Sequence, residues 1–206
     1  MPLFIILRAQ PVQLRREWSI EMTLGQAKAM TMKLLDDYMI EAPPTDDEET
    51  LAKLNAMFQS AQVFLSTIKP IRKACIIGHK PTDTWYAEYD LPDDFSQAYK
   101  VRDETGDNYS VEFLGTKILV EDTQPHTLRI DYYAFPTEIT DETTDDFVFE
   151  LSQDAQQVLP YAVAADLLKT DPSADYTAFE VKYNNLVQNL DTRQSVGISF
   201  VGGQMI

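Results

Sequence analysis

The chain has 206 residues, of which 44% are hydrophobic and 11% aromatic, which excludes an intrinsically disordered protein and allows a substantial core. Its formal net charge is −16, and residues 81–206 hold 7 Lys and Arg against 24 Asp and Glu, so the clustered cations that tight binding to nucleic acid needs are missing. The single cysteine, Cys75, excludes an internal disulfide framework and suits a reducing cytoplasm, and no run of residues is long and apolar enough to predict a membrane span.

The first helix is predicted from a capping signal. Thr23 is followed three residues later by Gln26, which is the spacing of a capping box, and the helix is expected to reach about Met39. The residues expected on its inner face are Leu24, Ala27, Met30, Leu34 and Tyr38. Residues 1–21 show no clear period and are interpreted as an N-terminal arm.

A second helix is predicted between Thr45, which has capping-box spacing with Glu48, and Pro70. Its apolar positions are spaced alternately by three and four residues: Leu51, Leu54, Phe58, Ala61, Leu65 and Ile68. Such a short heptad seam favours an antiparallel hairpin with the first helix, and contact with another subunit is the alternative.

The period of the apolar residues changes to two after residue 73, which predicts antiparallel strands. The expected strands lie near residues 74–79, 84–90, 97–102, 109–114, 117–121 and 127–134. Alternation along Leu128, Ile130 and Tyr132 indicates one buried and one solvated face. Residues 74–150 are therefore expected to form a compact antiparallel sheet or small barrel, with residues 141–146 as a solvated acidic loop.

The helical period returns at Ser152, and Pro160 inside it predicts a kink or break near Gln156. Asp171 followed by Pro172 predicts the start of a last helix. Its expected inner face holds Tyr176, Phe179, Tyr183, Leu186, Val187 and Leu190. The predicted fold is α+β: a helical bundle formed by N- and C-terminal helices (residues 22–73 and 151–191) with an inserted antiparallel β domain.

Residues 192–206 form the C-terminal tail in our division of the chain, and its last part, Ser195 to Ile206, carries no charge. Its apolar residues are Val196, Ile198, Phe200, Val201, Met205 and Ile206. A terminal segment of this kind is unfavourable in water, so it either packs as a strand on its own sheet or inserts into a partner by strand addition.

No residue pattern predicts an enzyme, a cofactor or a metal site. His79 and His126 have turn-like placements at strand ends, and Cys75 lies in an apolar run typical of an inert buried thiol. The oxygen-rich segment Asp103–Asn108 lacks the spacing of a calcium loop, and a turn with a glycine bulge explains it better.

Aromatic residues are dense in the predicted strands: Trp85, Tyr86, Tyr89, Tyr99, Tyr109, Tyr132, Tyr133 and Phe135. They are interpreted as sheet core or as a protein interface. A carbohydrate- or ligand-binding β module on a helical scaffold is the alternative function.

The order of these parts resembles the head-to-tail connector (adaptor) proteins of tailed bacteriophages, over roughly residues 22–191. The quoted motifs are Thr67-Ile68-Lys69-Pro70-Ile71-Arg72-Lys73, Leu91-Pro92-Asp93-Asp94-Phe95, Leu128-Arg129-Ile130-Asp131-Tyr132-Tyr133, Phe135-Pro136 and Leu159-Pro160-Tyr161-Ala162-Val163-Ala164-Ala165-Asp166-Leu167-Leu168, then Phe179 and Tyr183. The strongest likeness lies in the helix pair 151–190, whereas residues 1–21 depart from the pattern.

The resemblance implies a structural virion protein of the neck, made in the host cytoplasm. It implies a homo-oligomeric ring, commonly a dodecamer, that binds the portal protein, meets tail or nozzle proteins and forms part of the DNA channel. Residues 195–206 would then reach toward the portal, and Arg72 and Lys73 would contact acidic neighbours in the ring, so that assembly would depend on salt.

Overall fold

The computed structural model describes residues 10–11, 21–36, 48–80, 85–121, 125–169 and 176–194. The predicted tail positions from Val196 to Ile206, Tyr38 and most of the N-terminal arm lie outside the described residues. Contacts divide the chain into two compact units. A β unit holds the short strand β1 and Pro70–Thr137, and a helical unit holds Ser19–Lys69 and Glu138–Ile206.

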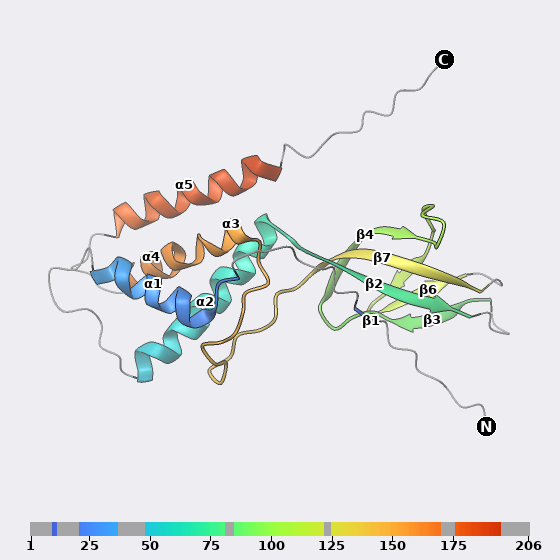
Figure 1. Cartoon of the computed structure of the whole chain (residues 1–206), viewed down its shortest axis with the longest axis horizontal. Helices are drawn as coiled ribbons and strands as arrows, with labels where there is room; N and C mark the ends of the chain where they lie inside the picture. The colour runs from blue at the N-terminus through green and yellow to red at the C-terminus, as the bar shows by residue number, and fades with distance from the viewer. Residues whose placement is uncertain are drawn as a thin grey trace, which may run out of the picture. The chain divides into compact units, whose positions relative to one another are not determined.

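The α+β class is confirmed, since helices from both ends of the chain pack together and antiparallel sheets are inserted between them (Figure 1). The helices are α1 (Leu24–Asp36), α2 (Glu48–Ile68), α3 (Gln153–Gln156), α4 (Leu159–Lys169) and α5 (Thr177–Gln194). The strands are β1 (Gln10–Pro11), β2 (Ile71–His79), β3 (Ala87–Asp90), β4 (Phe95–Arg102), β5 (Glu112–Leu114), β6 (Lys117–Val120) and β7 (His126–Ala134).

Helix α1 begins with the predicted capping box. The backbone N–H of Gln26 donates to Thr23 Oγ1 at 3.2 Å, and the N–H of Thr23 donates to Gln26 Oε1 at 3.0 Å. Two backbone donors that the helix itself cannot satisfy are thereby paired.

The inner face of α1 differs from the prediction. Leu24, Ala27, Thr31 and Leu35 are fully buried, whereas Met30 is 42% exposed. Thr31 can occupy an inner position because its hydroxyl donates to the Ala27 carbonyl at 3.0 Å. A polar residue therefore lies where a search for apolar period selects Met30.

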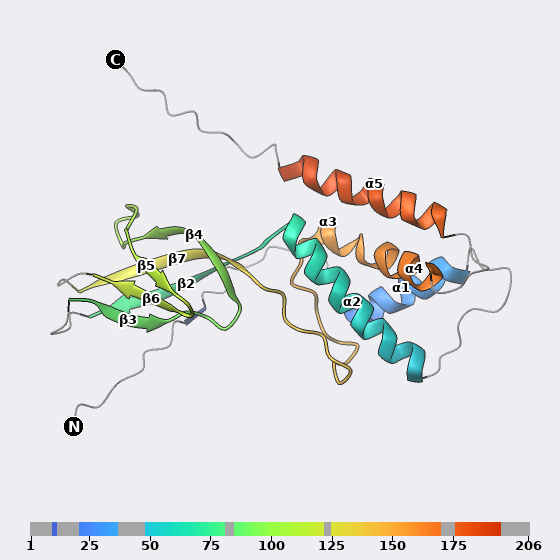
Figure 2. The ribbon, with the colours of Figure 1, turned by 180° about the vertical axis from the view of Figure 1, so that it is seen from behind.

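Helix α4 packs against α1, α2 and α5, as both ribbon views show (Figures 1 and 2). The expected hairpin, in which the first two helices pack directly on each other, is wrong. Helix α1 and helix α2 each pack mainly against α4 instead. The side chains of α4 explain this, since small residues allow close approach of helices. Its buried residues are Leu159, Pro160, Ala162, Val163, Ala164, Ala165 and Leu168.

The predicted break in the helix before Pro160 is confirmed. Helix α3 ends at Gln156 and α4 begins at Leu159, so Pro160 lies in the first turn of α4, where its missing N–H costs nothing. Two other predictions hold more loosely. The seam of α2 is buried at Leu54, Phe58, Ala61 and Leu65. Helix α5 buries Phe179 and Leu190, whereas Tyr176, which precedes the helix, is 38% exposed.

The six strands predicted from alternation are all present, and they form two sheets of antiparallel strands rather than one. One sheet has the order β1-β2-β7-β4 and the other has the order β3-β6-β5. Contacts between side chains join the two sheets, including the hydrogen bond between His79 Nδ1 and the Tyr89 hydroxyl at 2.9 Å and the stacked rings of Phe95 and Phe113. Cys75, Leu128 and Ile130 on the first sheet and Ile118 and Val120 on the second fill the space between them.

Candidate functional site

The two histidines and the cysteine of the β unit pack within the sheets, as expected from the sequence. His79 and His126 are partners across β2 and β7, with ring centroids 4.7 Å apart, and Nδ1 of His79 is 2.9 Å from the Tyr89 hydroxyl. Cys75 is fully buried, and burial followed by the charges of Asp94 and Asp131 raises its pKa to about 11. The thiol is therefore protonated and inert at neutral pH.

The oxygen-rich segment after β4 folds as the expected glycine turn. Asp103 Oδ1 accepts hydrogen bonds from the N–H and hydroxyl of Thr105 and from the N–H of Asp107, and Gly106 has φ of 92°. These bonds, led by the one from the Thr105 hydroxyl, lower the pKa of Asp103.

Within the described part of the chain, no group of three His, Cys, Asp or Glu side chains could hold a metal ion. In the same residues, no helix has the length and apolar character needed to cross a membrane.

The two basic residues predicted for ring contacts, Arg72 and Lys73, point to opposite faces of β2. Lys73 Nζ forms an ion pair with Asp94 Oδ2 at 2.7 Å, and the Tyr132 hydroxyl donates to the other oxygen of Asp94 at 3.0 Å. Arg72 is exposed, and its guanidinium lies over the ring of Tyr99, 5.9 Å from the centroid. Of these two residues, only Arg72 has an exposed side chain that a partner could contact. The six tail positions cannot be placed, since they lie outside the described residues.

Arg72 belongs to a larger cationic surface on the outer side of the four-stranded sheet, which we name the arginine face. Its members are Arg72, Tyr99, Arg102, Arg129 and Tyr133. The register opposes Arg72 to Tyr133 and Arg102 to Arg129, while the rings of Tyr99 and Tyr133 lie 4.8 Å apart. The members come from three strands and are distant in sequence, so only the register of the sheet brings them together.

One buried carboxylate organises this face. Asp131 is 4% exposed, and it accepts hydrogen bonds from Nε of Arg129 at 2.8 Å and from Nη2 of Arg102. Burial alone would raise the pKa of Asp131, but the hydrogen bonds and charges of Arg129 and Arg102 outweigh burial and hold it below its usual value. Asp131 stays ionised and fixes both guanidinium groups at neutral pH.

A second surface lies on the helical unit and is formed by residues 138–150, which we name the acidic loop. Its backbone pairs with the N-terminal end of α1: the N–H of Leu24 donates to the Phe147 carbonyl at 2.8 Å and the N–H of Gly25 donates to the Asp145 carbonyl at 2.9 Å. Thr23 and Val148 form an isolated antiparallel bridge. The start of α1 therefore finds hydrogen-bond acceptors in the loop.

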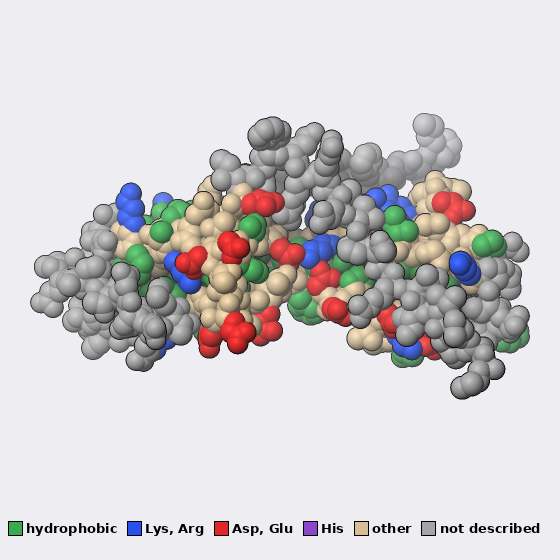
Figure 3. Space-filling model, turned by 60° about the horizontal axis from the view of Figure 1, so that its bottom comes forward, with side chains coloured by type: hydrophobic (Ala, Val, Ile, Leu, Met, Phe, Trp, Pro, Cys, Tyr) green, Lys and Arg blue, Asp and Glu red, His purple; other side chains and the backbone are tan. Residues whose placement is uncertain are grey.

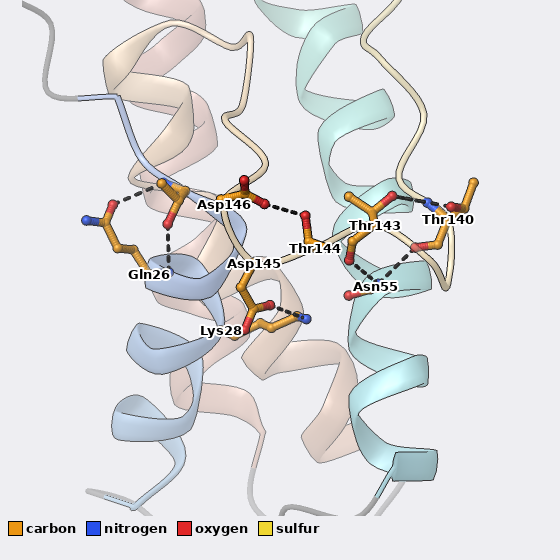
Figure 4. Close-up of polar contacts among 9 residues, drawn as sticks. Gln26, Lys28, Asn55, Thr140, Thr143, Thr144, Asp145 and Asp146 are labelled. Atoms are coloured by element: carbon orange, nitrogen blue, oxygen red, sulfur yellow. Dashed lines mark hydrogen bonds and ion pairs between the residues drawn. The ribbon is translucent and has the colours of Figure 1, made fainter.

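Amide side chains of α2 and α3 also hold the acidic loop, and Figure 4 shows one of them, Asn55, with its hydrogen bonds to the loop. Asn55 of α2 donates to the Thr140 carbonyl at 2.9 Å, and Gln59 accepts from the N–H of Ile139 at 2.8 Å. Gln156 of α3 donates to the carbonyls of Phe149 at 3.0 Å and Leu151 at 2.7 Å. Because these side chains pair with backbone, they fix the path of the loop rather than its side chains.

The fixed backbone presents carboxylates to solvent. The side chains of Glu138, Asp141, Glu142, Asp145 and Asp146 are all exposed. Acidic side chains gather on this part of the helical unit in the space-filling view (Figure 3). Lys28 forms an ion pair with Asp145 at 2.8 Å, and among the described residues neither Asp141 nor Glu142 forms one.

Gly25 is the residue that allows the loop to lie so close to α1. A Cβ atom at this position would be 2.9 Å from Cβ and 3.2 Å from the carbonyl oxygen of Asp145, which is tighter than van der Waals contact permits. The sequence shows Gly25 and the alternation of Phe147, Phe149 and Leu151, which were signals for a paired segment at this place.

The aromatic residues weighed as a ligand platform are only partly at the surface. Trp85 is 87% and Tyr86 48% exposed, whereas Tyr89 and Tyr132 are buried in the core between the sheets. Comparison of the sequence with protein-family models and with curated proteins found no match.

Proposed function

We propose that the chain is a structural virion protein, a subunit of an oligomeric ring that connects the portal of a tailed bacteriophage to its tail. The observation that carries the proposal is the architecture: a helical unit assembled from both ends of the chain, with an antiparallel β unit inserted between α2 and α3. This is the arrangement that the resemblance to head-to-tail connectors implies.

The charge of the chain supports this role. With 33 Asp and Glu against 17 Lys and Arg, an assembled ring would present a surface that repels a phosphate backbone. DNA must slide through a connector without adhering, and an acidic channel meets that need. A ring whose lumen is lined mainly by Lys and Arg would contradict this part of the proposal.

The partners in this proposal are the portal protein, tail or nozzle proteins and further copies of the chain, and no catalysis or cofactor is needed. Co-expression with the portal protein, followed by native mass spectrometry, tests it. We expect a defined ring joined to the larger portal oligomer. A monomer that never joins the portal would overturn the proposal.

The uncharged tail provides a second test of the same function. We expect a chain lacking residues 195–206 to remain folded and to lose portal binding, since those residues would insert into the portal. Thermal unfolding of the truncated chain checks its fold. If truncation instead abolishes cooperative unfolding, the tail belongs to the core of the subunit.

A ligand-binding β module is the second candidate, and the 87% exposure of Trp85 favours it. An indole presented to solvent can stack on a sugar ring. Binding to a glycan array that is abolished by Trp85→Ala would support this function over the connector, and a chain that binds no glycan would remove it.

A further inference from the structure

The arginine face is unusual for this chain. Residues 81–206 contain only 7 Lys and Arg, yet Arg102 and Arg129 lie on adjacent strands of one sheet and share that sheet surface with Arg72. One buried carboxylate, that of Asp131, forms ion pairs with two of these arginines, Arg102 and Arg129. The face is therefore cationic on a protein whose net charge is strongly negative.

The guanidinium groups are positioned but not saturated. Each arginine has five N–H donors, and Asp131 engages Nη2 of Arg102 and Nε of Arg129. The side chains of these arginines are still 32% and 38% exposed, and Arg72 and Tyr99 are exposed beside them. Donors held in place by a buried carboxylate suit recognition of further carboxylates, since guanidinium binds them with paired hydrogen bonds.

The acidic loop has the complementary properties. Its backbone is fixed by α1, α2 and α3, so its main chain needs little ordering on binding. In the described part of the chain, neither Asp141 nor Glu142 at its tip forms an ion pair. The chain thus carries an anionic surface and a cationic surface that match in chemistry.

We propose that the arginine face of one copy of this chain binds the acidic loop of a second copy. The inference rests on the proposed function, because it names the contact by which ring subunits join. The two surfaces are different patches, so the contact is heterologous, and repetition of a heterologous contact closes a ring when the rotation allows. Tyr99 and Tyr133 add apolar area beside the arginines, as is common at interfaces between proteins.

Nucleic acid is the other anionic occupant that tyrosines and arginines on a sheet would fit. A second copy fits better for two reasons. The chain as a whole repels phosphate backbones, with its net charge of −16, and Asp131 occupies the centre of the face.

Charge reversal in the purified full-length chain tests the inference, with self-association measured by sedimentation velocity at low salt. Arg72→Glu is expected to weaken association about 10- to 100-fold, and Asp141→Lys with Glu142→Lys is expected to do the same. The chain that combines all three changes is expected to recover part of the lost association, because the introduced carboxylate and ammonium groups attract each other. Raising the salt to about 0.5 M should weaken association of the original chain.

Lys182→Glu on α5 and Glu112→Lys on β5 are matched controls, since both residues are exposed and lie outside the two surfaces. Arg72→Gln serves as a second variant that removes the charge without adding a carboxylate, and thermal unfolding shows that each variant is folded. The inference is overturned if the original chain stays monomeric up to about 1 mM. An effect of Arg72→Glu no larger than that of Lys182→Glu, failure of the combined chain to recover, or capture of a single-stranded oligonucleotide through Arg72 overturns it equally.

Portal binding separates this inference from the proposed function. Self-association that follows the charges, without any complex with the portal, keeps the contact and removes the connector. A portal-bound ring that forms equally well with Arg72→Glu keeps the connector and removes the contact.

Discussion

The acidic loop and the arginine face achieve a fixed surface charge by different physical means. The loop has no regular secondary structure, and its path is set by hydrogen bonds from the first turn of α1 and from the buried amides of Asn55 and Gln156. The face lies on a regular sheet, and one buried ion, Asp131, orients its side chains. In the loop, hydrogen bonds from other elements fix the backbone, and the carboxylates are exposed. In the arginine face, the sheet fixes the backbone, and the buried carboxylate of Asp131 fixes the charged side chains.

This difference separates the stability of each surface from its charge. Amide side chains, which do not ionise, hold the loop, so the hydrogen bonds that they make to its backbone should not depend on pH. An ionised carboxylate holds the arginine face, so the geometry of that face should change when Asp131 is protonated. Each surface can therefore be disturbed at a residue that is itself hidden from a partner.

The largest effect is expected for Gln156→Ala. The change removes the hydrogen bonds to the Phe149 and Leu151 carbonyls and the bond accepted from the N–H of Met22 at 2.9 Å. Buried backbone groups without partners cost about 1–3 kcal/mol each, so we expect a loss of about 2–4 kcal/mol in the free energy of unfolding of the helical unit. Urea denaturation, with hydrogen exchange to localise the effect, measures it.

Gln157→Ala is the matched control, since Gln157 is the exposed neighbour with the same side chain. It should change the stability by less than about 0.5 kcal/mol. Equal effects of the two substitutions would show that the amide of Gln156 does not hold the loop.

Only some features of the helical unit can be predicted from the sequence. Thr23, Gln26 and Pro160 are local signals, and each is confirmed because the physics that they report is local. The seam of α2 is buried at Leu54, Phe58, Ala61 and Leu65, but it does not pair with α1 as predicted.

The path of the acidic loop depends on two buried amides, and a buried amide has no period that marks it. Asn55 lies 85 residues before Thr140, and Gln156 follows the loop closely and donates back to Phe149 and Leu151. The exposed carboxylates of the loop could be predicted, and Gly25 with the alternation of Phe147, Phe149 and Leu151 signalled the segment paired with α1, but the hold of the buried amides could not be predicted.

A smaller effect is expected for Asp131→Asn in the β unit. The amide keeps the volume of the carboxylate and loses its charge, and the two arginines remain partly solvated. We therefore expect a loss of about 1–2 kcal/mol in the free energy of unfolding, less than for a fully buried ion pair. Hydrogen exchange should rise in β2, β4 and β7 and stay unchanged in α1 and α2, and the reverse pattern would contradict the assignment.

The pH dependence of this contribution has a definite sign. The pKa of Asp131 is lower in the folded chain than in the unfolded chain, so its stabilisation is present above the unfolded value of about 3.9 and is lost as the pH falls through the folded value. The difference in stability between the original chain and Asp131→Asn should shrink over that acid range. Asp154, whose pKa is also lowered in the presence of Lys69, acts in the helical unit and cancels in this comparison.

Gly25→Ala is expected to cost about 1 kcal/mol, because the added methyl group pushes against the Asp145 backbone while alanine improves the helix. Gly78→Ala is the control, since a Cβ at that position meets no atom within 4 Å. Thermal unfolding of both variants measures the difference. A stabilised Gly25→Ala chain would show that the loop moves away from α1 at little cost.

The arginine face shows a different limit of sequence analysis. Alternation located the strands, and it correctly placed Ile130 and Tyr132 inside. Asp131 lies between those two residues, and alternation alone predicts an exposed carboxylate there. The register that sets Arg102 beside Arg129 buries it, and register between strands depends on contacts that no single strand encodes.

The smallest perturbation uses Cys75, the one cysteine of the chain, as a reporter of the β unit. Its burial and a pKa of about 11 leave almost no thiolate at neutral pH, so we expect labelling by a disulfide reagent to be slow until the sheets open. Asp131→Asn should speed labelling, because it weakens the sheet that contains Cys75, and Gln156→Ala should leave the rate unchanged while it destabilises the helices. If Gln156→Ala speeds labelling as much as Asp131→Asn does, the two units unfold together and the acidic loop and the arginine face share one stability.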